Sequence, residues 1–167
     1  MKQGNCNEAS LETINTGESQ MRVFLAMPYS QFCDETYTMS TVYKNFFKKL
    51  IAGIENHGHT VFLAAKRENW GANYDGDAFC TQVDYNEITS CDLVCMVPGW
   101  PFSGGVHVEA GWASAVKRPM NIFLQRDKFY SPMITGLHAL TDVQYFTYDD
   151  FDDALVDVIV ASICSRK

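Results

Sequence analysis

Two acidic residues, Asp84 and Glu109, have a type and a sequence setting that could support catalysis. Glu109 follows a segment rich in glycine and proline, and Asp84 lies in a stretch that reads as a helix before the apolar run 93–97. Two carboxylates around a glycosidic bond can divide the work, since one attacks or stabilises the anomeric carbon and the other manages the proton of the leaving group. Taken singly, Asp84 is equally compatible with a solvated helix residue, and Glu109 with an acid favoured by the helix dipole.

A phosphate site is predicted directly before Glu109. Ser103, Gly104 and Gly105 end a loop between a predicted strand and a helix that starts near Val106. Such loops present free backbone N–H groups and the positive end of a helix dipole to an anion. The glycine pair by itself is a weak signal. A carboxylate beside an anion site is electrostatically unfavourable, and for this reason we interpret Glu109 as functional.

Composition excludes several classes of function. The formal net charge of −7 argues against a nucleic-acid surface, which needs a dense basic face, but it is compatible with a small phosphorylated ligand. No apolar run approaches the roughly 20 residues of a membrane span, and the N-terminus lacks the apolar stretch of a secretory signal. The six cysteines form no CxxC pair and no zinc-type spacing. We therefore expect a cytoplasmic protein with no metal, no cofactor and no membrane or nucleic-acid partner.

The chain is predicted to hold one domain, because 167 residues with 47% hydrophobic content suit a single core. Residues 1–20 are polar without periodicity and predict a flexible tail, which leaves 21–167 as the catalytic domain. Apolar runs predict strands at 22–27, 60–65, 92–97, 119–124 and 143–146. Helices are predicted between Ser40 and Gly58, over 77–90, from 106 to about 117, as a short helix in 131–138, and over 151–163 behind Asp149 or Asp150 as cap.

Strands that alternate with helices predict right-handed crossovers and a parallel sheet covered on both faces. We expect an α/β, flavodoxin-like (Rossmann-like) sheet of five strands in the order 2-1-3-4-5. Ligands of such sheets bind at the carboxyl ends of the strands, where the strand order reverses. The loops 27–32, 66–71 and 98–105 are therefore expected on one rim.

Three segments carry a family resemblance: Arg-Glu-Asn-Trp-Gly-Ala at 67–72, Asp-Tyr-Asn-Glu-Ile at 84–88, and Gly-Val-His-Val-Glu-Ala-Gly-Trp-Ala-Ser at 105–114. They resemble the pyrimidine-nucleotide N-glycosidases, which are CMP and 5-hydroxymethyl-CMP hydrolases of nucleoside antibiotic and antivitamin pathways. That group belongs to the nucleoside 2-deoxyribosyltransferase superfamily. The Asp…Gly-x-x-x-Glu-x-Gly-x-Ala pattern is typical of the superfamily, whereas the Arg-Glu-x-Trp-Gly and His-Val-Glu-x-Gly-Trp-Ala-Ser blocks indicate the CMP group.

The resemblance implies a role for each matching residue. Glu109 matches the nucleophile that forms a glycosyl ester at C1′, and Asp84 matches the acid that helps the base leave. Ser103 matches a phosphate ligand, and Tyr29 lies where the family packs the base. Ser131 matches a serine that reaches the phosphate from a neighbouring subunit, which implies at least a homodimer.

One loop departs from the wider superfamily. Residues 27–30, Met-Pro-Tyr-Ser, lack the Gly-Ser-x-Arg form of the deoxynucleotide hydrolases, so Lys66 or Arg67 is the expected substitute as a phosphate ligand. The predicted reaction is hydrolysis of CMP or 5-hydroxymethyl-CMP to free base and ribose 5-phosphate, through a covalent intermediate on Glu109. The alternatives are a transferase that passes 2-deoxyribose between bases, and a nucleotide-binding module without catalysis.

Overall fold

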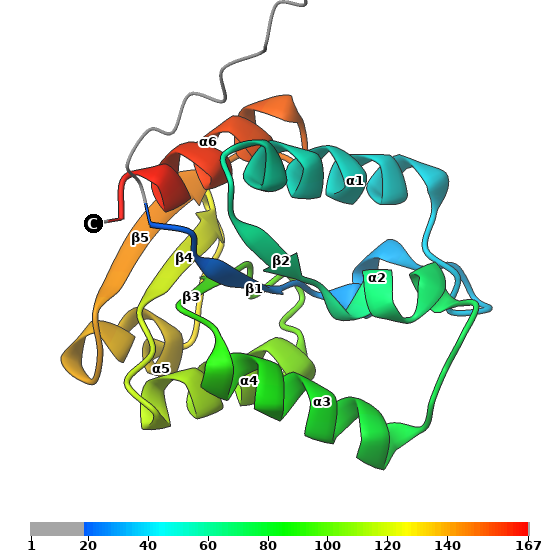
Figure 1. Ribbon diagram of the computed structural model, residues 1–167, viewed down its shortest axis with the longest axis horizontal. Helices are drawn as coiled ribbons and strands as arrows, with labels where there is room; N and C mark the ends of the chain where they lie inside the picture. Colours follow the sequence, from blue (N-terminus) through cyan, green and yellow to red (C-terminus); the bar gives the residue numbers. More distant parts are fainter. Residues whose placement is uncertain (1–18, 167) are drawn as a thin grey trace, which may run out of the picture.

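The computed structural model describes residues 19–166, and its strands form one parallel sheet (Figure 1). Within these residues the sheet has five strands, namely β1 (Arg22–Ala26), β2 (Thr60–Phe62), β3 (Leu93–Met96), β4 (Met120–Gln125) and β5 (Val143–Tyr148). Their order is β2-β1-β3-β4-β5, and every neighbouring pair is parallel. The predicted α/β class and strand order are confirmed. The predicted N-terminal tail lies outside the described residues up to position 18.

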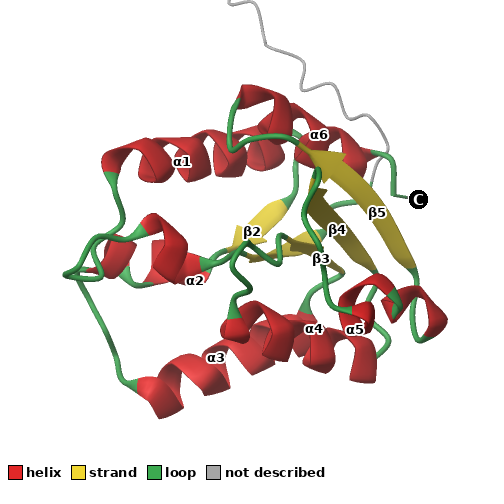
Figure 2. Ribbon diagram, turned by 180° about the vertical axis from the view of Figure 1, so that it is seen from behind, coloured by secondary structure: helices red, strands yellow, loops and turns green. Residues whose placement is uncertain are grey.

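Helices cover both faces of the sheet. The long helices α1 (Thr41–Asn56) and α6 (Asp153–Cys164) lie against one face, and α3 (Asp77–Ser90), α4 (Gly104–Ala115) and α5 (Pro132–Thr135) against the other (Figures 1 and 2). The short α2 (Ala64–Arg67) lies beyond the carboxyl end of β2. Short 3-10 helices span Tyr29–Phe32, Asn69–Gly71 and Leu137–Ala139. None of the helices in residues 19–166 has the length and apolar character needed to cross a bilayer.

The central strands have continuous apolar sequences because both of their faces are buried. Side chains alternate along a strand, so Val23 and Leu25 of β1 pack in the core under α1 and α6. Phe24 and Ala26 point the other way, into the core shared with α3 and α4. The same alternation divides β3. The periodicity of the sequence predicts one apolar face of α1 made of Val42, Phe46, Phe47, Leu50, Ile51 and Ile54. All of these are buried except Val42, in the first turn, which is 73% exposed.

Three predicted boundaries are wrong in ways that have physical reasons. The strand predicted over 60–65 ends at Phe62, because Ala64 and Ala65, which are strong helix formers, begin α2. The helix predicted from Val106 begins two residues earlier, since Gly104 and Gly105 already form its first turn behind Ser103. The cap of α6 is Asp152 rather than Asp149 or Asp150, and its side chain accepts a hydrogen bond from the Leu155 amide at 3.1 Å.

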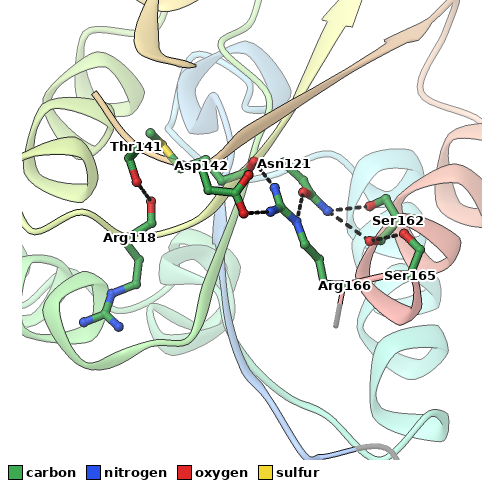
Figure 3. A network of polar contacts seen from close by, with 8 residues as sticks. Arg118, Asn121, Thr141, Asp142, Ser162, Ser165 and Arg166 are labelled. Carbon is green, nitrogen blue, oxygen red and sulfur yellow. Dashed lines mark hydrogen bonds and ion pairs between the residues drawn. The ribbon is translucent and has the colours of Figure 1, made fainter. Parts of the chain in front are cut away.

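A polar network fastens the C-terminal end of α6 to the amino ends of β4 and β5 (Figure 3). Asn121, fully buried within β4, donates to the Ser162 hydroxyl at 3.0 Å and accepts from Arg166 Nε at 2.8 Å. The same guanidinium donates to the Met120 carbonyl at 2.6 Å and pairs with Asp142. A buried amide is stable only when it is hydrogen-bonded, so this network accounts for asparagine in an apolar strand.

Candidate active site

The carboxyl ends of β1, β2 and β3 bring three loops together. Gly99, after β3, has a φ of +81°, and a Cβ added there would lie 2.8 Å from Pro28 Cβ and 2.7 Å from Gln31 Nε2. The loops after β1 and β3 therefore touch, and glycine is required at this contact. Gln31 Nε2 also donates to the Pro101 carbonyl. This is the edge at which a parallel sheet with this strand order binds its ligand.

Glu109, in the second turn of α4, turns its carboxyl group into the interior at this edge. It lines a small cavity of about 30 Å³ with Leu25, Met27, Tyr29 and Ala65. Its Oε2 atom is buried and has no hydrogen-bond partner within residues 19–166. Burial, and then the negative charge of Asp84, raise the pKa of Glu109 to about 8. The carboxyl group of Glu109 is thus buried among mostly apolar side chains without a hydrogen bond to Oε2 from residues 19–166, which is an unfavourable arrangement for a residue with a purely structural role.

Asp84 projects from α3, which packs against α4. Its Oδ1 atom is also buried and also lacks a partner among the described residues. Burial raises the pKa of Asp84 to about 6, with smaller contributions in the same direction from Glu68 and Glu87, while Arg67 lowers it. Because the charge of Asp84 acts on Glu109 across the α3–α4 contact, the structure brings together the two acids that the sequence separates by 25 positions (109 minus 84).

The pKa values of both acids are raised toward neutral pH, to about 6 for Asp84 and to about 8 for Glu109. Burial is the largest cause in both cases. Two neighbouring carboxyl groups raised in this way can hold a single proton between them near neutral pH, which is what acid–base work by a carboxylate pair requires.

The predicted phosphate site is the open N-terminus of α4. Ser103 is the N-cap, and its hydroxyl accepts a hydrogen bond from the Val106 amide at 3.4 Å. Gly104 and Gly105 are exposed, and a Cβ added at Gly104 would meet nothing within 4 Å. Their amides are among the first four of the helix, which have no carbonyl partner inside it. His107 braces this turn, with its Nδ1 atom 2.8 Å from the Ser103 carbonyl oxygen.

Tyr29 lies just after β1, as the sequence predicts, and forms one wall of the Glu109 cavity. Its hydroxyl donates to the Tyr37 carbonyl at 3.1 Å. Gly71 approaches the same hydroxyl so closely that an added Cβ would lie 2.6 Å from it, and the φ of Gly71 is +98°. Asn69 and Trp70 also have positive φ values, so this left-handed turn holds the tyrosine in place.

Arg67 is held by two carboxylates. Its guanidinium pairs with Glu68 Oε1 at 2.6 Å and with Asp75 Oδ2 at 3.1 Å, and it lies over the Phe79 ring at 5.6 Å. Lys66, the alternative phosphate ligand, is more exposed and pairs with Glu55 at 3.3 Å. Both cations of this segment are thus paired with carboxylates.

Ser131 is the N-cap of α5, and its hydroxyl accepts from the Met133 amide at 3.2 Å. It makes no hydrogen bond with Glu109, Asp84 or Ser103 in the part of the chain that the structure describes. Tyr130, its neighbour, lies 6.1 Å from the Phe102 ring in the loop before Ser103, measured between ring centroids. Ser131 therefore lies on the same side of the molecule as the α4 N-terminus without reaching the carboxylate pair of its own chain.

Sequence reasoning missed Glu68 and the cavity that it lines. This cavity of about 510 Å³ is bounded by Tyr29, Thr36, Tyr37, Glu68, Gly71 and Tyr74. Glu68 stands in the Arg-Glu-Asn-Trp-Gly-Ala block at 67–72, but the resemblance implies no role for it. The signal that could have found it is the position of this carboxylate directly beside Arg67, shortly after a predicted strand. No three His, Cys, Asp or Glu side chains within residues 19–166 converge in a way that could hold a metal ion.

The solved structures that are similar to this chain include two that are 30% and 32% identical to it. The structure of Clostridium botulinum CMP N-glycosidase, BcmB, is 30% identical with a TM-score of 0.61, and the match covers 83% of this chain and 98% of that one. The solution structure of BlsM is 32% identical with a TM-score of 0.69, covering 88% of this chain and 93% of that one. No curated protein sequence matches significantly.

Two further matches bear on the fold and the family. A conserved protein from Enterococcus faecalis V583 has a TM-score of 0.59 over 86% of this chain and 99% of that one, but at 13% identity it shows only the shared fold. A family model described as a domain of unknown function, DUF4406, matches residues 33–122, which include both acids of the buried pair. The chain belongs to the DUF4406 family, within the nucleoside 2-deoxyribosyltransferase-like superfamily that also contains BcmB and BlsM.

Proposed function

We propose that the protein hydrolyses the N-glycosidic bond of a pyrimidine ribonucleotide, CMP or 5-hydroxymethyl-CMP, to free base and ribose 5-phosphate. The observation that carries this proposal is the pair of Asp84 and Glu109, each of which has a buried oxygen without a hydrogen-bond partner in residues 19–166, and of which Asp84 raises the pKa of Glu109. The similarity to a CMP N-glycosidase supports the same class of reaction. We place the reaction in a nucleoside antibiotic or antivitamin pathway.

The proposed reaction has two steps that share one proton. In the first, a Glu109 oxygen attacks C1′ as the bond from C1′ to the base nitrogen breaks, and the base takes the bonding electron pair together with a proton from Asp84. In the second, Asp84 accepts a proton from a water molecule whose oxygen attacks C1′, and the ester bond to Glu109 breaks. Two displacements at the same carbon give retention of configuration.

Substrate binding would redistribute the proton of the pair. The reacting sugar develops positive charge as the base departs, and this charge favours the ionised form of a nearby Glu109. The proton then belongs on Asp84, beside the base. The amides of Gly104 and Gly105 and the Ser103 hydroxyl would hold the 5′-phosphate, so binding energy from a group remote from the reaction would place C1′ against Glu109.

The test is a panel of nucleoside 5′-monophosphates incubated with the purified protein, with chromatography of the products. We expect CMP or 5-hydroxymethyl-CMP to release its base together with ribose 5-phosphate, and cytidine without the phosphate to react at least about 100-fold more slowly, because the anchoring energy is lost. Base exchange that requires an added second base would instead identify a transferase. Tight CMP binding without base release over hours would contradict the proposal and favour a binding module.

We further propose that the protein is a homodimer in which Ser131 of one subunit reaches the phosphate bound by the other. Ser131 is flanked by Phe129 and Met133, which are 73% and 77% exposed. Apolar side chains exposed to this degree next to a polar functional residue are typical of an interaction surface. We expect Met133→Lys to shift the protein toward monomer in light scattering and to raise KM for CMP, whereas Leu140→Lys, at a similarly exposed leucine, should change neither. A monomeric wild-type protein with full activity would contradict this proposal.

A further inference from the structure

The cavity of about 510 Å³ lies next to the carboxylate pair, because Tyr29 lines both this cavity and the small one at Glu109. Three of its walls are tyrosines, namely Tyr29, Tyr37 and Tyr74, and its single charged lining residue is Glu68. Aromatic walls of this kind suit a flat ring that binds by stacking. The volume is ample for a nucleobase. Glu68 is therefore the charged group that a ring bound in this cavity would contact.

Glu68 is held as an acceptor. Its Oε1 atom accepts from Arg67 Nη2 at 2.6 Å and from the Cys80 thiol at 3.4 Å. Its Oε2 atom accepts no hydrogen bond from residues 19–166, although only 14% of the side chain is exposed. A carboxylate that forms an ion pair with arginine accepts hydrogen bonds and donates none. A ring that reaches Oε2 must therefore present a donor.

The position of Glu68 relates it to the reacting acids. The charge of Glu68 raises the pKa of Asp84. It also contributes to the raised pKa of the Tyr29 hydroxyl, after the larger effects of burial and of Cys33. Glu68 therefore lines the tyrosine-lined cavity and is close enough to Asp84 for its charge to act there. If the sugar of a nucleotide lies at Glu109, its base would extend into this cavity. The edge of the base that is remote from the sugar would then face the residues that line the cavity.

Resting on the proposed function, we infer that Glu68 determines base specificity by accepting a hydrogen bond from the exocyclic amino group of an amino-bearing base. Cytosine carries an amine at position 4, which can donate to Oε2. Uracil carries a carbonyl oxygen at the same position, so two acceptors would face each other in a site with little water. A site built to hydrogen-bond one group rejects the analogue that lacks it far more strongly than an apolar pocket rejects a change in size.

Arg67 acts in this arrangement through Glu68. Its two arms join Glu68 to Asp75, and its stacking on Phe79 ties this corner to the first turn of α3. One guanidinium nitrogen contacts Glu68 and the other contacts Asp75, so the rigid fork of arginine holds the two carboxylates at a fixed relative position, which a flexible lysine would not do. Arg67 is thus a positioning residue for the acceptor that reads the base.

The experiment compares kcat/KM for CMP and UMP in three proteins: wild type, Glu68→Gln and the control Glu55→Gln. Glu55 lies on α1, pairs with Lys66 and has a side chain that is 47% exposed. We expect the wild type to prefer CMP by at least about 100-fold, and Glu68→Gln to lower that ratio by about 10- to 100-fold, the effect of one hydrogen bond to a charged group. The ratio in Glu55→Gln should equal that of the wild type.

A further variant separates recognition from folding. A glutamine amide can donate to the uracil oxygen as well as accept from the cytosine amine, whereas an aspartate only accepts. We therefore expect Glu68→Asp to retain the preference for CMP while its kcat/KM falls. Equal loss of the preference in Glu68→Asp and Glu68→Gln would show a structural role and overturn the inference, as would an unchanged ratio in Glu68→Gln. If Glu68→Gln does not fold, the test is to measure the dissociation constants of CMP and UMP with the variant Glu109→Gln. Equal affinities for the two nucleotides would overturn the inference about Glu68. Failure of the wild type to cleave any nucleotide would instead refute the proposed function.

Discussion

Glu109→Gln is expected to lower kcat for base release by at least about 1000-fold, the loss typical of removing a nucleophile. Glutamine fills the same space in the cavity beside Leu25 and Met27, but its amide does not form the ester with C1′. Nucleotide binding should survive, because the phosphate would be held by the α4 N-terminus and the base by the tyrosine-lined cavity. Single-turnover kinetics with CMP and equilibrium binding measured on the same protein separate the two effects.

A chemical rescue distinguishes the loss of a nucleophile from a structural defect. Glu109→Ala leaves space beside C1′, and we expect azide to restore base release by attacking C1′ directly. The product would be a ribosyl azide 5-phosphate of inverted configuration, since only one displacement has occurred. Glu55→Gln, which removes an exposed carboxylate, is the control and should keep wild-type activity. Activity of Glu109→Gln above about one tenth of the wild type would remove Glu109 from the mechanism.

Asp84→Asn is expected to lower kcat with CMP by about 100- to 1000-fold, within the range of general acid catalysis. Asparagine has no proton to give to a departing base. A nucleotide analogue whose leaving group needs no protonation, such as 4-nitrophenolate, should lose much less activity in the same variant. Comparable losses for the two substrates would show that Asp84 does not act as the acid.

The pH profile of Asp84→Asn gives an independent readout. In the wild type, the pair is active with one proton, so kcat/KM should fall below about pH 6, where both acids are protonated, and above about pH 8, where both are ionised. In Asp84→Asn only Glu109 still titrates, and it has to be ionised. The pKa of Glu109 remains raised by burial but falls below the wild-type value of about 8, because the neighbouring charge is gone. The profile should therefore keep one acidic limb, below about pH 8, and lose the basic limb. A bell-shaped profile retained in Asp84→Asn would contradict the assignment.

Much of the fold could be predicted because burial on both faces leaves a direct trace in the sequence. The central strands β1 and β3 have unbroken apolar sequences, and α3 is found over the predicted residues 77–90. The prediction failed where a few residues were ambiguous. Leu63, Ala64 and Ala65 continue an apolar run, so nothing in their pattern shows that the strand has ended and a helix begun.

The candidate site could be predicted only in part. Sequence spacing identifies Asp84 and Glu109 as acids near predicted binding elements, but their meeting depends on how α3 packs against α4, which is a tertiary property. The order of their pKa values follows from burial, and burial is invisible in the chain. Glu68 was missed for the same reason, because its setting depends on the left-handed turn from Asn69 to Gly71 and on the Arg67 pair.

The buried, unpartnered oxygens of Asp84 and Glu109 have a consequence for protein engineering. Each buried polar atom without a hydrogen bond lowers the stability of the fold by about 1–3 kcal/mol, so exchanging either acid for an apolar residue of similar size should make the protein more tolerant of heat. A selection for thermal resistance alone would therefore tend to enrich nucleotide binders that no longer release a base. Screening for robust variants of this protein has to measure turnover at every round.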